Sequence, residues 1–330
     1  MSLNQSTTLR SVFENRNLYI GAAVDIELPQ TDKDYLELLR KEFNMVTPEN
    51  AMKWWALQPK RDEFVFDDAD EIVSFAKENN MAIRGHTLVW DKGFPKWLKE
   101  GDFKSEEIKE IVKNHVQAVA KHFRGKFYCW DVINEALNSK GLDENMFLFN
   151  HLGPKYVGLI FRWAHEADPN VKLFYNEWGA DRPNNKFEAL YKLVAGLIEE
   201  GVPIHGVGLQ MHVGLGNPRL TGKYPAPGEV KNVIERLGRL GLEVHITEMD
   251  VQIQGGVGSH EERLREQAMA YKNILQEAIS CSNFKALVQW GVEDKHSWIH
   301  EFTGEHDAPL LFDENYQPKP AYFAVKELLD

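Results

Sequence analysis

The sequence predicts an α/β fold in which eight β-strands alternate with eight helices. Short runs rich in β-branched and aromatic residues recur along the chain, and amphipathic segments lie between them. The runs end near residues 24, 50, 90, 135, 178, 212, 250 and 292, so each step of 26 to 45 residues has room for one strand and one helix. Alternating strands and helices predict a parallel sheet, and eight such units predict a closed (β/α)₈ TIM barrel.

The strands are expected where apolar residues run almost without interruption, as they do in strands covered on both faces. In the fourth run the residues FYCWDVI are followed directly by Asn134 and Glu135, with no turn residue between. The eight runs are 18–27, 43–50, 82–90, 127–135, 172–178, 206–212, 243–250 and 286–292.

The helices are expected from a 3.6-residue apolar period and from capping signals. Ser105 is expected to cap a helix over 105–123, whose apolar residues keep to one face. Thr31 precedes Asp34 by three residues, as in a capping box. Further helices are expected at 68–79, 154–167, 185–200, 228–240, 260–280 and 318–329.

Size and charge narrow the class of protein. The 330 residues lie within the range of one barrel, so we expect a single domain over 1–330. A net charge of -12 argues against a nucleic-acid partner, which requires clustered Lys and Arg. The N-terminal segment lacks a signal-peptide core, and no run approaches the roughly 20 apolar residues of a membrane span. We therefore expect a cytoplasmic protein that binds no membrane; the sequence does not specify its oligomeric state.

Polar and aromatic residues gather where the predicted strands end. The C-terminal ends of the strands form one rim of a (β/α)₈ barrel, and active sites of this fold lie there. Glu135 and Glu248 belong to the fourth and seventh runs, which are nearly opposite in a ring of eight. The other candidates at this rim are Glu49, Asn50, Lys53, His86, Trp90, Asn134, Asn176, Glu177, Trp178, Gln210, His212, Asp250, Trp290 and Trp298.

A pair of carboxyl groups that flank a bond is typical of glycoside hydrolysis. One, kept protonated by its surroundings, gives its proton to the leaving oxygen, and the other attacks the sugar or activates water. Indole rings suit the C–H faces of sugars, and amides and carboxylates bind hydroxyls. The histidines alternatively suggest a metal-dependent hydrolase, but the chain has no H-E-x-x-H motif and no histidine pair after the first strand. We expect no metal and no cofactor.

Motifs at the predicted strand ends occur in a characteristic order along nearly the whole chain. They are TPENAMKW (47–54), GHTLVW (85–90), WDVINEA (130–136), YNE (175–177), GLQMH (208–212), ITEMDV (246–251), QWGVEDKHSW (289–298) and PLLFDENYQPKPAY (309–322). Together they resemble glycoside hydrolase family 10, the retaining endo-1,4-β-xylanases. The resemblance implies hydrolysis of β-1,4-xylosidic bonds by double displacement through a glycosyl-enzyme intermediate.

The resemblance also implies roles for individual residues. Glu135 matches the family's acid/base and Glu248 its nucleophile. His212 and Asp250 match residues that hydrogen-bond the nucleophile, and Asn134 matches the amide that binds the sugar 2-hydroxyl. Positions that line the glycone subsites, together with the partner of the histidine at 86, are matched by Glu49, Asn50, Lys53, His86, Trp90, Gln210, Trp290, Trp298 and Asp131.

The chain departs from the family pattern around the cleft. After GHTLVW it has Asp91-Lys92-Gly93 where the family usually has H-S-Q, and the usual glutamine contacts the second glycone sugar. We expect the reaction to survive and the preferred substrate length to be altered. Single departures are Trp178 for a tyrosine, Glu177 for an aspartate, His296 for a tyrosine and Ile299 for an arginine.

Three other functions remain open. The first is a different glycosidase on a related barrel, such as a β-1,4-glucanase. The second is a non-catalytic sugar-binding barrel, which the presence of both glutamates argues against. The third is a structural barrel without a ligand, which leaves the tryptophans at the strand ends unexplained. The leading interpretation is an intracellular xylanase that meets imported xylo-oligosaccharides and xylan fragments.

Overall fold

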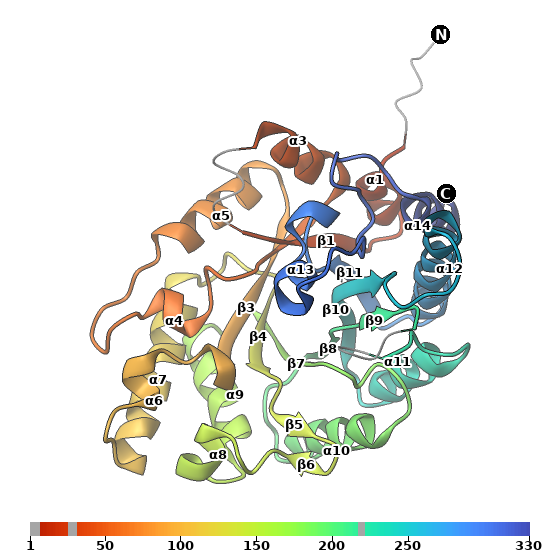
Figure 1. Ribbon diagram of the computed structural model, residues 1–330. Helices are drawn as coiled ribbons and strands as arrows, with labels where there is room; N and C mark the ends of the chain where they lie inside the picture. Colours follow the sequence, from red (N-terminus) through yellow and green to blue (C-terminus); the bar gives the residue numbers. More distant parts are fainter. Residues whose placement is uncertain (1–6, 26–31, 217–221) are drawn as a thin grey trace.

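A computed structural model describes residues 7–25, 32–216 and 222–330 and confirms the closed parallel barrel surrounded by helices (Figure 1). Neighbouring strands pair in chain order, and pairing of the last barrel strand with the first closes the ring. The barrel strands are β1 (Tyr19–Val24), β2 (Met45–Pro48), β3 (Ala82–Trp90), β4 (Cys129–Asn134), β7 (Lys172–Glu177), β8 (Gly206–Leu209), β10 (Glu243–Gln252) and β11 (Phe284–Gln289).

The eight predicted helices form the outer layer. Seven were predicted with both bounds, and their ends lie within two residues of those bounds; the eighth, predicted only to open at 31–34, begins at Lys33. They are α3 (Lys33–Glu42), α5 (Asp67–Glu78), α7 (Ser105–His122), α9 (Tyr156–Ala167), α10 (Asn185–Glu199), α11 (Glu229–Arg239), α12 (His260–Ile279) and α14 (Pro320–Leu329). A further helix, α1 (Leu9–Glu14), precedes β1 and packs against α14. The last two residues of the first predicted run, 26 and 27, lie outside the described residues.

The capping predictions were only partly right. In α7 the predicted apolar face is buried, and burial of each such side chain contributes about 1.5–3 kcal/mol. Ser105 does not cap it, because Ser105 is already helical and Lys104 occupies the N-cap position, where its N–H donates to the Glu107 carboxylate. Thr31 lies outside the described residues; Asp32 caps α3 and accepts from the N–H groups of the first turn.

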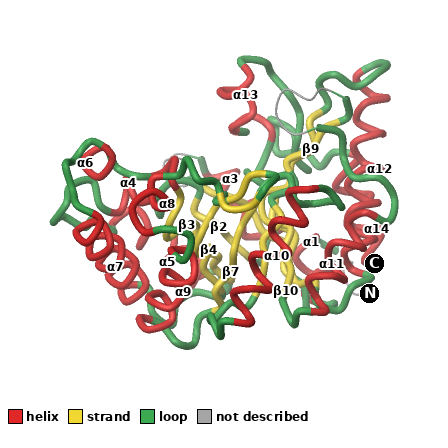
Figure 2. Tube along the Cα trace, turned by 90° about the horizontal axis from the view of Figure 1, so that it is seen from below, coloured by secondary structure: helices red, strands yellow, loops and turns green. Residues whose placement is uncertain are grey.

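Short elements that the sequence analysis did not predict cover the C-terminal end of the barrel. Figure 2 shows two of them, β9 and α13, standing above the ring of strands. They are α4 (Trp54–Leu57), the 3₁₀ turn η1 (Asp91–Gly93), α6 (Lys96–Lys99), the hairpin β5 (Leu137–Asn138) and β6 (Gly141–Leu142), α8 (Phe147–Leu152), β9 (His212–Gly214), η2 (Asp294–His296) and α13 (Trp298–Thr303).

The strand boundaries around the sixth and seventh runs differ from the prediction. The sixth run is divided, because β8 ends at Leu209 and the chain resumes as β9 at His212. β9 pairs with residues 250–252, which extends β10 to Gln252. Glu248 therefore lies inside a long strand rather than at its end.

A buried ion pair inside the barrel supports the site above it. Arg84 of β3 pairs with Asp131 of β4, and both side chains are buried. Asp131 also holds His86 Nδ1 at 3.0 Å. Burial alone would raise the pKa of Asp131, but Arg84 and His86 outweigh it and lower that pKa. No helix within the described residues is both long and apolar enough to cross a membrane.

Candidate active site

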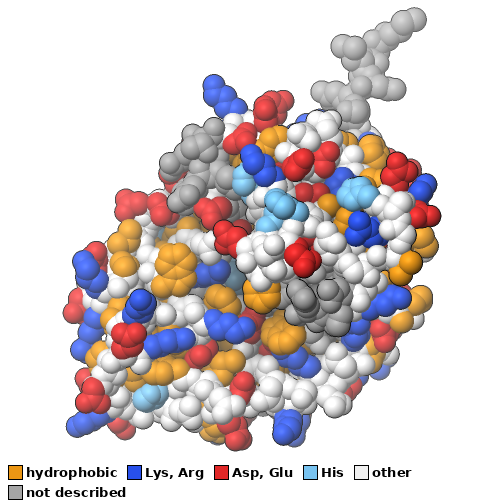
Figure 3. All heavy atoms as spheres, in the orientation of Figure 1, with side chains coloured by type: hydrophobic (Ala, Val, Ile, Leu, Met, Phe, Trp, Pro, Cys, Tyr) orange, Lys and Arg blue, Asp and Glu red, His pale blue; other side chains and the backbone are white. Residues whose placement is uncertain are grey.

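A cleft of about 580 Å³ opens at the C-terminal end of the barrel. Figure 3 shows this face of the molecule, where hydrophobic, basic and acidic side chains lie close together. The predicted residues that line the cleft are Glu49, Asn50, Lys53, His86, Trp90, Asn134, Glu135, Trp178, Gln210, His212, Glu248, Trp290 and Trp298. Four other residues that were expected in or beside the site do not line the cleft: Asp131, Asn176, Glu177 and Asp250. Asp250 lies behind His212 and contacts its Nδ1.

The backbone turns sharply at two positions in the site. Glu135 follows β4 directly and has φ +57°, and Met211 between β8 and β9 has φ +64°. Residues other than glycine seldom adopt this left-handed conformation, and such strain often accompanies functional sites. The Glu135 N–H donates to the Asn176 carbonyl at 3.0 Å, which fixes the turn against β7.

Three side chains donate to the carboxylate of Glu135. Trp90 Nε1 and Lys92 Nζ donate to Oε2 at 3.0 and 2.8 Å, and Gln210 Nε2 donates to Oε1 at 3.1 Å. Burial raises the pKa of Glu135, but the Lys92 ammonium and these hydrogen bonds outweigh it and lower the pKa below its usual range. The surroundings of Glu135 thus favour its ionised form. The sequence analysis had expected the surroundings of the acid to keep it protonated.

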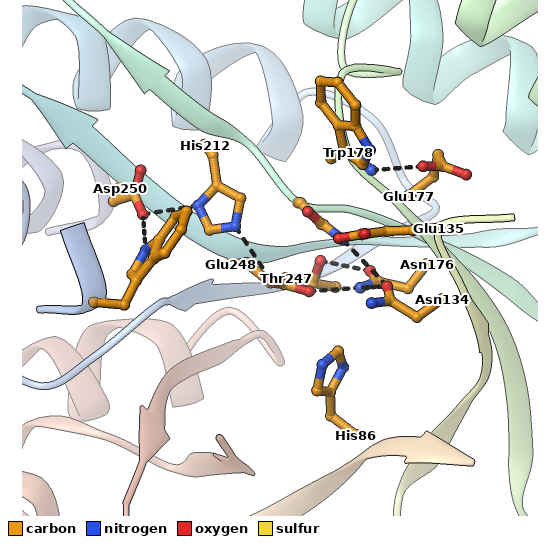
Figure 4. A network of polar contacts seen from close by, with 12 residues as sticks. His86, Asn134, Glu135, Asn176, Glu177, Trp178, His212, Thr247, Glu248 and Asp250 are labelled. Carbon is orange, nitrogen blue, oxygen red and sulfur yellow. Dashed lines mark hydrogen bonds and ion pairs between the residues drawn. The ribbon is translucent and has the colours of Figure 1, made fainter. Parts of the chain in front are cut away.

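Glu248 is held by an amide and an imidazole (Figure 4). Asn176 Nδ2 donates to Glu248 Oε1 at 2.6 Å and to Asn134 Oδ1 at 2.9 Å. The hydroxyl of Thr247 donates to Asn176 Oδ1 at 2.7 Å, which fixes the orientation of the amide. Asn176 was expected at this rim, at the end of the fifth strand, but without a role of its own; its contacts with Glu248 and Asn134 come from the structure.

His212 bridges two carboxylates, as the resemblance implied. Its Nδ1 lies 2.7 Å from Asp250 Oδ2, and its Nε2 lies 3.2 Å from Glu248 Oε2. Trp298 Nε1 also donates to Asp250 Oδ2, at 2.9 Å. Burial lowers the pKa of His212, but Asp250 and Glu248 outweigh it and raise the pKa to about 10. The imidazole is therefore charged at neutral pH and donates to both carboxylates.

Another group of predicted residues lines the cleft beside β2 and β3. Lys53 Nζ donates to Asn50 Oδ1 at 2.8 Å and lies 5.1 Å from the centre of the Trp90 ring. Burial raises the pKa of Glu49 to about 7, although Lys53 opposes the shift. The ring of Trp290 meets the imidazole of His86 edge-on at 5.1 Å. These contacts combine ring faces with hydrogen-bonding groups, as a sugar site requires.

Comparison with known proteins identifies the family. The family model described as glycosyl hydrolase family 10 matches residues 8–328. The chain belongs to glycosyl hydrolase family 10. It is 37% identical to endo-1,4-beta-xylanase B of Thermotoga neapolitana over 99% of this chain and 93% of that protein.

Two solved family 10 structures superimpose closely on the chain. Xylanase 10B from Thermotoga petrophila in complex with xylobiose has a TM-score of 0.92 at 37% identity, covering 99% of this chain and 98% of that one. TsXylA, an intracellular xylanase from Thermoanaerobacterium saccharolyticum, has a TM-score of 0.88 at 36% identity, covering 98% of this chain and 99% of that one.

The 91–93 segment, where the chain departs from the family 10 pattern, directs only Lys92 into the cleft. Asp91 Oδ1 accepts from the Phe147 N–H at 2.9 Å, at the start of α8. Gly93 is buried, and a Cβ atom there would lie 3.0 Å from the Trp90 ring. The departure therefore brings an ammonium group beside Glu135, and Gly93 is not among the residues that line the cleft.

A second departure from the family 10 pattern forms a buried ion pair beneath an exposed indole. Trp178 lines the cleft and is 44% exposed, and Lys186 Nζ lies 3.8 Å from the centre of its ring. Lys186 Nζ also lies 2.9 Å from Glu177 Oε1. Burial raises the pKa of Glu177 to about 7, against the opposing effects of Lys186 and of the Tyr175 hydroxyl, which donates to Oε2 at 2.8 Å.

The remaining departures lie on or beside α13. Ile299 is buried and does not line the cleft, whereas His296 contacts Glu293. Glu301 and Phe302 of α13 do line the cleft, although the sequence analysis did not select them. Among the described residues, no group of three or more His, Cys, Asp or Glu side chains is placed to hold a metal ion.

Proposed function

We propose that this family 10 protein is a retaining endo-1,4-β-xylanase that acts on xylan fragments and xylo-oligosaccharides. The observation that carries the proposal is the placement of Glu135 and Glu248 in one cleft, each with its own set of hydrogen-bond donors. The similarity to a xylanase solved with xylobiose supports the substrate class.

In the first step, Glu248 attacks the anomeric carbon while Glu135 gives its proton to the leaving glycosidic oxygen. The C–O bond to the leaving sugar breaks as the ester to Glu248 forms. In the second step, the Glu135 carboxylate takes a proton from water, whose oxygen attacks the anomeric carbon and releases Glu248. Asn176 and His212 orient Glu248 through the hydrogen bonds described above, and Asn134 binds the 2-hydroxyl.

Substrate binding divides between polar groups and aromatic rings. The polar groups bind sugar hydroxyls, and the indoles stack on sugar rings, with Trp178 as the most exposed ring of this set. The proposed binding residues are Glu49, Asn50, Lys53, His86, Trp90, Trp178, Gln210, Trp290 and Trp298.

We also propose that residues 1–330 act as one catalytic domain inside the cell. The similarity to TsXylA, which is described as intracellular, supports this location. An enzyme in the cytoplasm meets short imported oligosaccharides rather than polymer.

Product analysis over matched sugar series tests the function. We expect hydrolysis of xylotriose to xylohexaose, with kcat/KM well above that for the equivalent cello-oligosaccharides, and loss of turnover in Glu248→Gln. Preferred hydrolysis of the cello-oligosaccharides would identify a β-1,4-glucanase instead. Binding of xylo-oligosaccharides without any cleavage would indicate a sugar-binding barrel.

The retaining mechanism makes a geometric prediction. The carboxyl groups of Glu135 and Glu248 should lie about 5–5.5 Å apart, against roughly 6.5–9.5 Å in inverting enzymes. A crystal structure with a bound xylo-oligosaccharide measures this separation, and a value in the longer range would contradict retention.

A further inference from the structure

Lys92 makes an ion pair with the proposed acid/base. Its Nζ lies 2.8 Å from Glu135 Oε2, and the two side chains are 65% and 13% exposed. The lysine comes from η1, which follows β3, whereas the glutamate follows β4. Lys92 stands where the family 10 pattern usually has a serine, so this contact belongs to the departure in this chain.

The charged groups around Glu135 come from several elements. Lys92 is the cation in direct contact with Glu135. Lys53, beyond the Trp90 ring, is a second cation, and the charge of Glu135 acts to raise its pKa. Glu177 of β7 is a nearby carboxyl group whose pKa is raised by the charge of Glu135, and Glu248 of β10 lines the same cleft. The neutral donors Trp90 and Gln210 favour an ionised Glu135 in addition to Lys92.

We propose that Lys92 is a positioning residue that holds Glu135 in its ionised form between proton transfers. The inference rests on the proposed function, because it concerns the acid/base of that reaction. Both carboxylate oxygens accept from nitrogen donors in the structure, which is the arrangement of a base and not of an acid.

The two halves of the reaction make opposite demands on this contact. Glu135 must carry a proton when the leaving oxygen departs, and it must be ionised when it takes a proton from the attacking water. The ammonium group of Lys92 favours the second state and opposes the first. Because the Lys92 side chain is mostly exposed, it is free to swing into solvent when the carboxyl group is protonated.

If Lys92 acts in this way, its effect on kcat/KM should depend on pH and on the leaving group of the substrate. The pH profile of kcat/KM reports ionisations of the free enzyme, and its basic limb reports loss of the proton from the acid. Lys92 should therefore place this limb at lower pH than it would otherwise have. A substrate with a very good leaving group, such as 2,4-dinitrophenyl β-xylobioside, needs no proton on the leaving oxygen and should not show the effect.

The test compares Lys92→Met with Lys92→Arg. Methionine keeps much of the length and removes the charge, whereas arginine keeps the charge. A matched control is Lys60→Met, because Lys60 also forms a Lys–Glu pair of 2.8 Å, with Glu63, on the surface outside the cleft. The pH profile of kcat/KM is measured for each variant with xylotriose and with the dinitrophenyl substrate.

We expect Lys92→Met to move the basic limb for xylotriose to higher pH, and Lys92→Arg and Lys60→Met to leave it in place. At pH values above the basic limb, each pH unit by which the limb moves would raise kcat/KM about tenfold, because the protonated fraction of Glu135 changes tenfold per unit. The dinitrophenyl profile should not move in parallel. An unmoved limb in Lys92→Met, or an equal movement in Lys60→Met, would overturn the inference while leaving a xylanase. Absence of xylotriose hydrolysis in the parent protein would instead reject the proposed function.

Discussion

At the residue scale, Asn176 connects Glu248 to Asn134 through a single amide. A hydrogen bond to a charged group contributes about 1.5–3 kcal/mol. We predict that Asn176→Ala lowers kcat on xylotriose by about 10- to 100-fold, because Glu248 loses the donor that orients it. Steady-state kinetics measures the loss, and circular dichroism verifies that the variant is folded. Turnover close to that of the parent would show that the amide is dispensable.

His212 supports a second prediction at this scale. His212→Asn keeps a donor on the side of Asp250 but removes the contact with Glu248. We expect kcat to fall strongly, and the free energy of unfolding to change less than in His212→Ala, which offers the buried Asp250 carboxylate no hydrogen-bond donor at this position. Near-normal turnover in His212→Asn would remove His212 from the mechanism.

The raised pKa of His212 also predicts how stability depends on pH. The native imidazole keeps its proton up to about pH 10, whereas its ordinary pKa is 6.5. Between these values the native state binds more protons than the unfolded state, so stability falls as pH rises. The contribution is complete below pH 6.5 and is lost as the pH approaches about 10. Urea unfolding of the parent and of His212→Asn across this range should show the difference between them shrinking, and a constant difference would contradict the linkage.

At the scale of elements, the ion pair between Glu177 and Lys186 joins β7 to α10 beneath Trp178. Removal of one partner from a buried pair costs about 3–5 kcal/mol. We predict that Lys186→Met destabilises the protein by this order at pH 8 and by less at pH 5, where Glu177 is protonated. The double variant Lys186→Met/Glu177→Gln should recover much of the loss. Denaturant unfolding measures each value, and an equal loss at both pH values would contradict the account.

Sequence patterns predicted the regular elements but not the connections between them. Apolar runs and helical periods are local, so the eight strands and eight helices could be placed from them. The extension of β10 depends on pairing with β9, which is nearly forty residues away in sequence and leaves no local signal. The turn at Glu135 is likewise not visible in the sequence, because Glu135 adopts φ +57°, a conformation that its residue type does not indicate.

Some site residues could be predicted from local motifs, and others could be found only in the structure. The locations of Glu135, Glu248, His212 and Asp250 in or beside the cleft could be predicted, because these residues occupy recognisable motifs at strand ends. The bridging amide of Asn176 and the contact of Lys92 with Glu135 could be found only in the three-dimensional arrangement. The sequence does not reveal which way each residue of the 91–93 segment faces. In the structure Lys92 enters the cleft, whereas Gly93 is buried against Trp90.

At the scale of the whole molecule, the barrel brings together residues from almost the entire chain. Residues from 49 to 302 line one cleft, because parallel strands end at the same rim. The ring of strands is closed by pairing between β11 and β1, so the positions of β4 and β10 across it are fixed relative to each other. This arrangement brings Glu135 and Glu248, which are distant in sequence, into one cleft.

Trapping of the covalent glycosyl-enzyme intermediate on Glu248 is the most direct test of the proposed mechanism. A 2-deoxy-2-fluoro-β-xylobioside with a dinitrophenyl leaving group slows the second step, so the ester should accumulate. Intact mass spectrometry should show one added fluoroxylobiosyl group, and peptide mapping should place it on Glu248. An adduct on another residue, or inactive Glu248→Gln taking up the same label, would contradict the account.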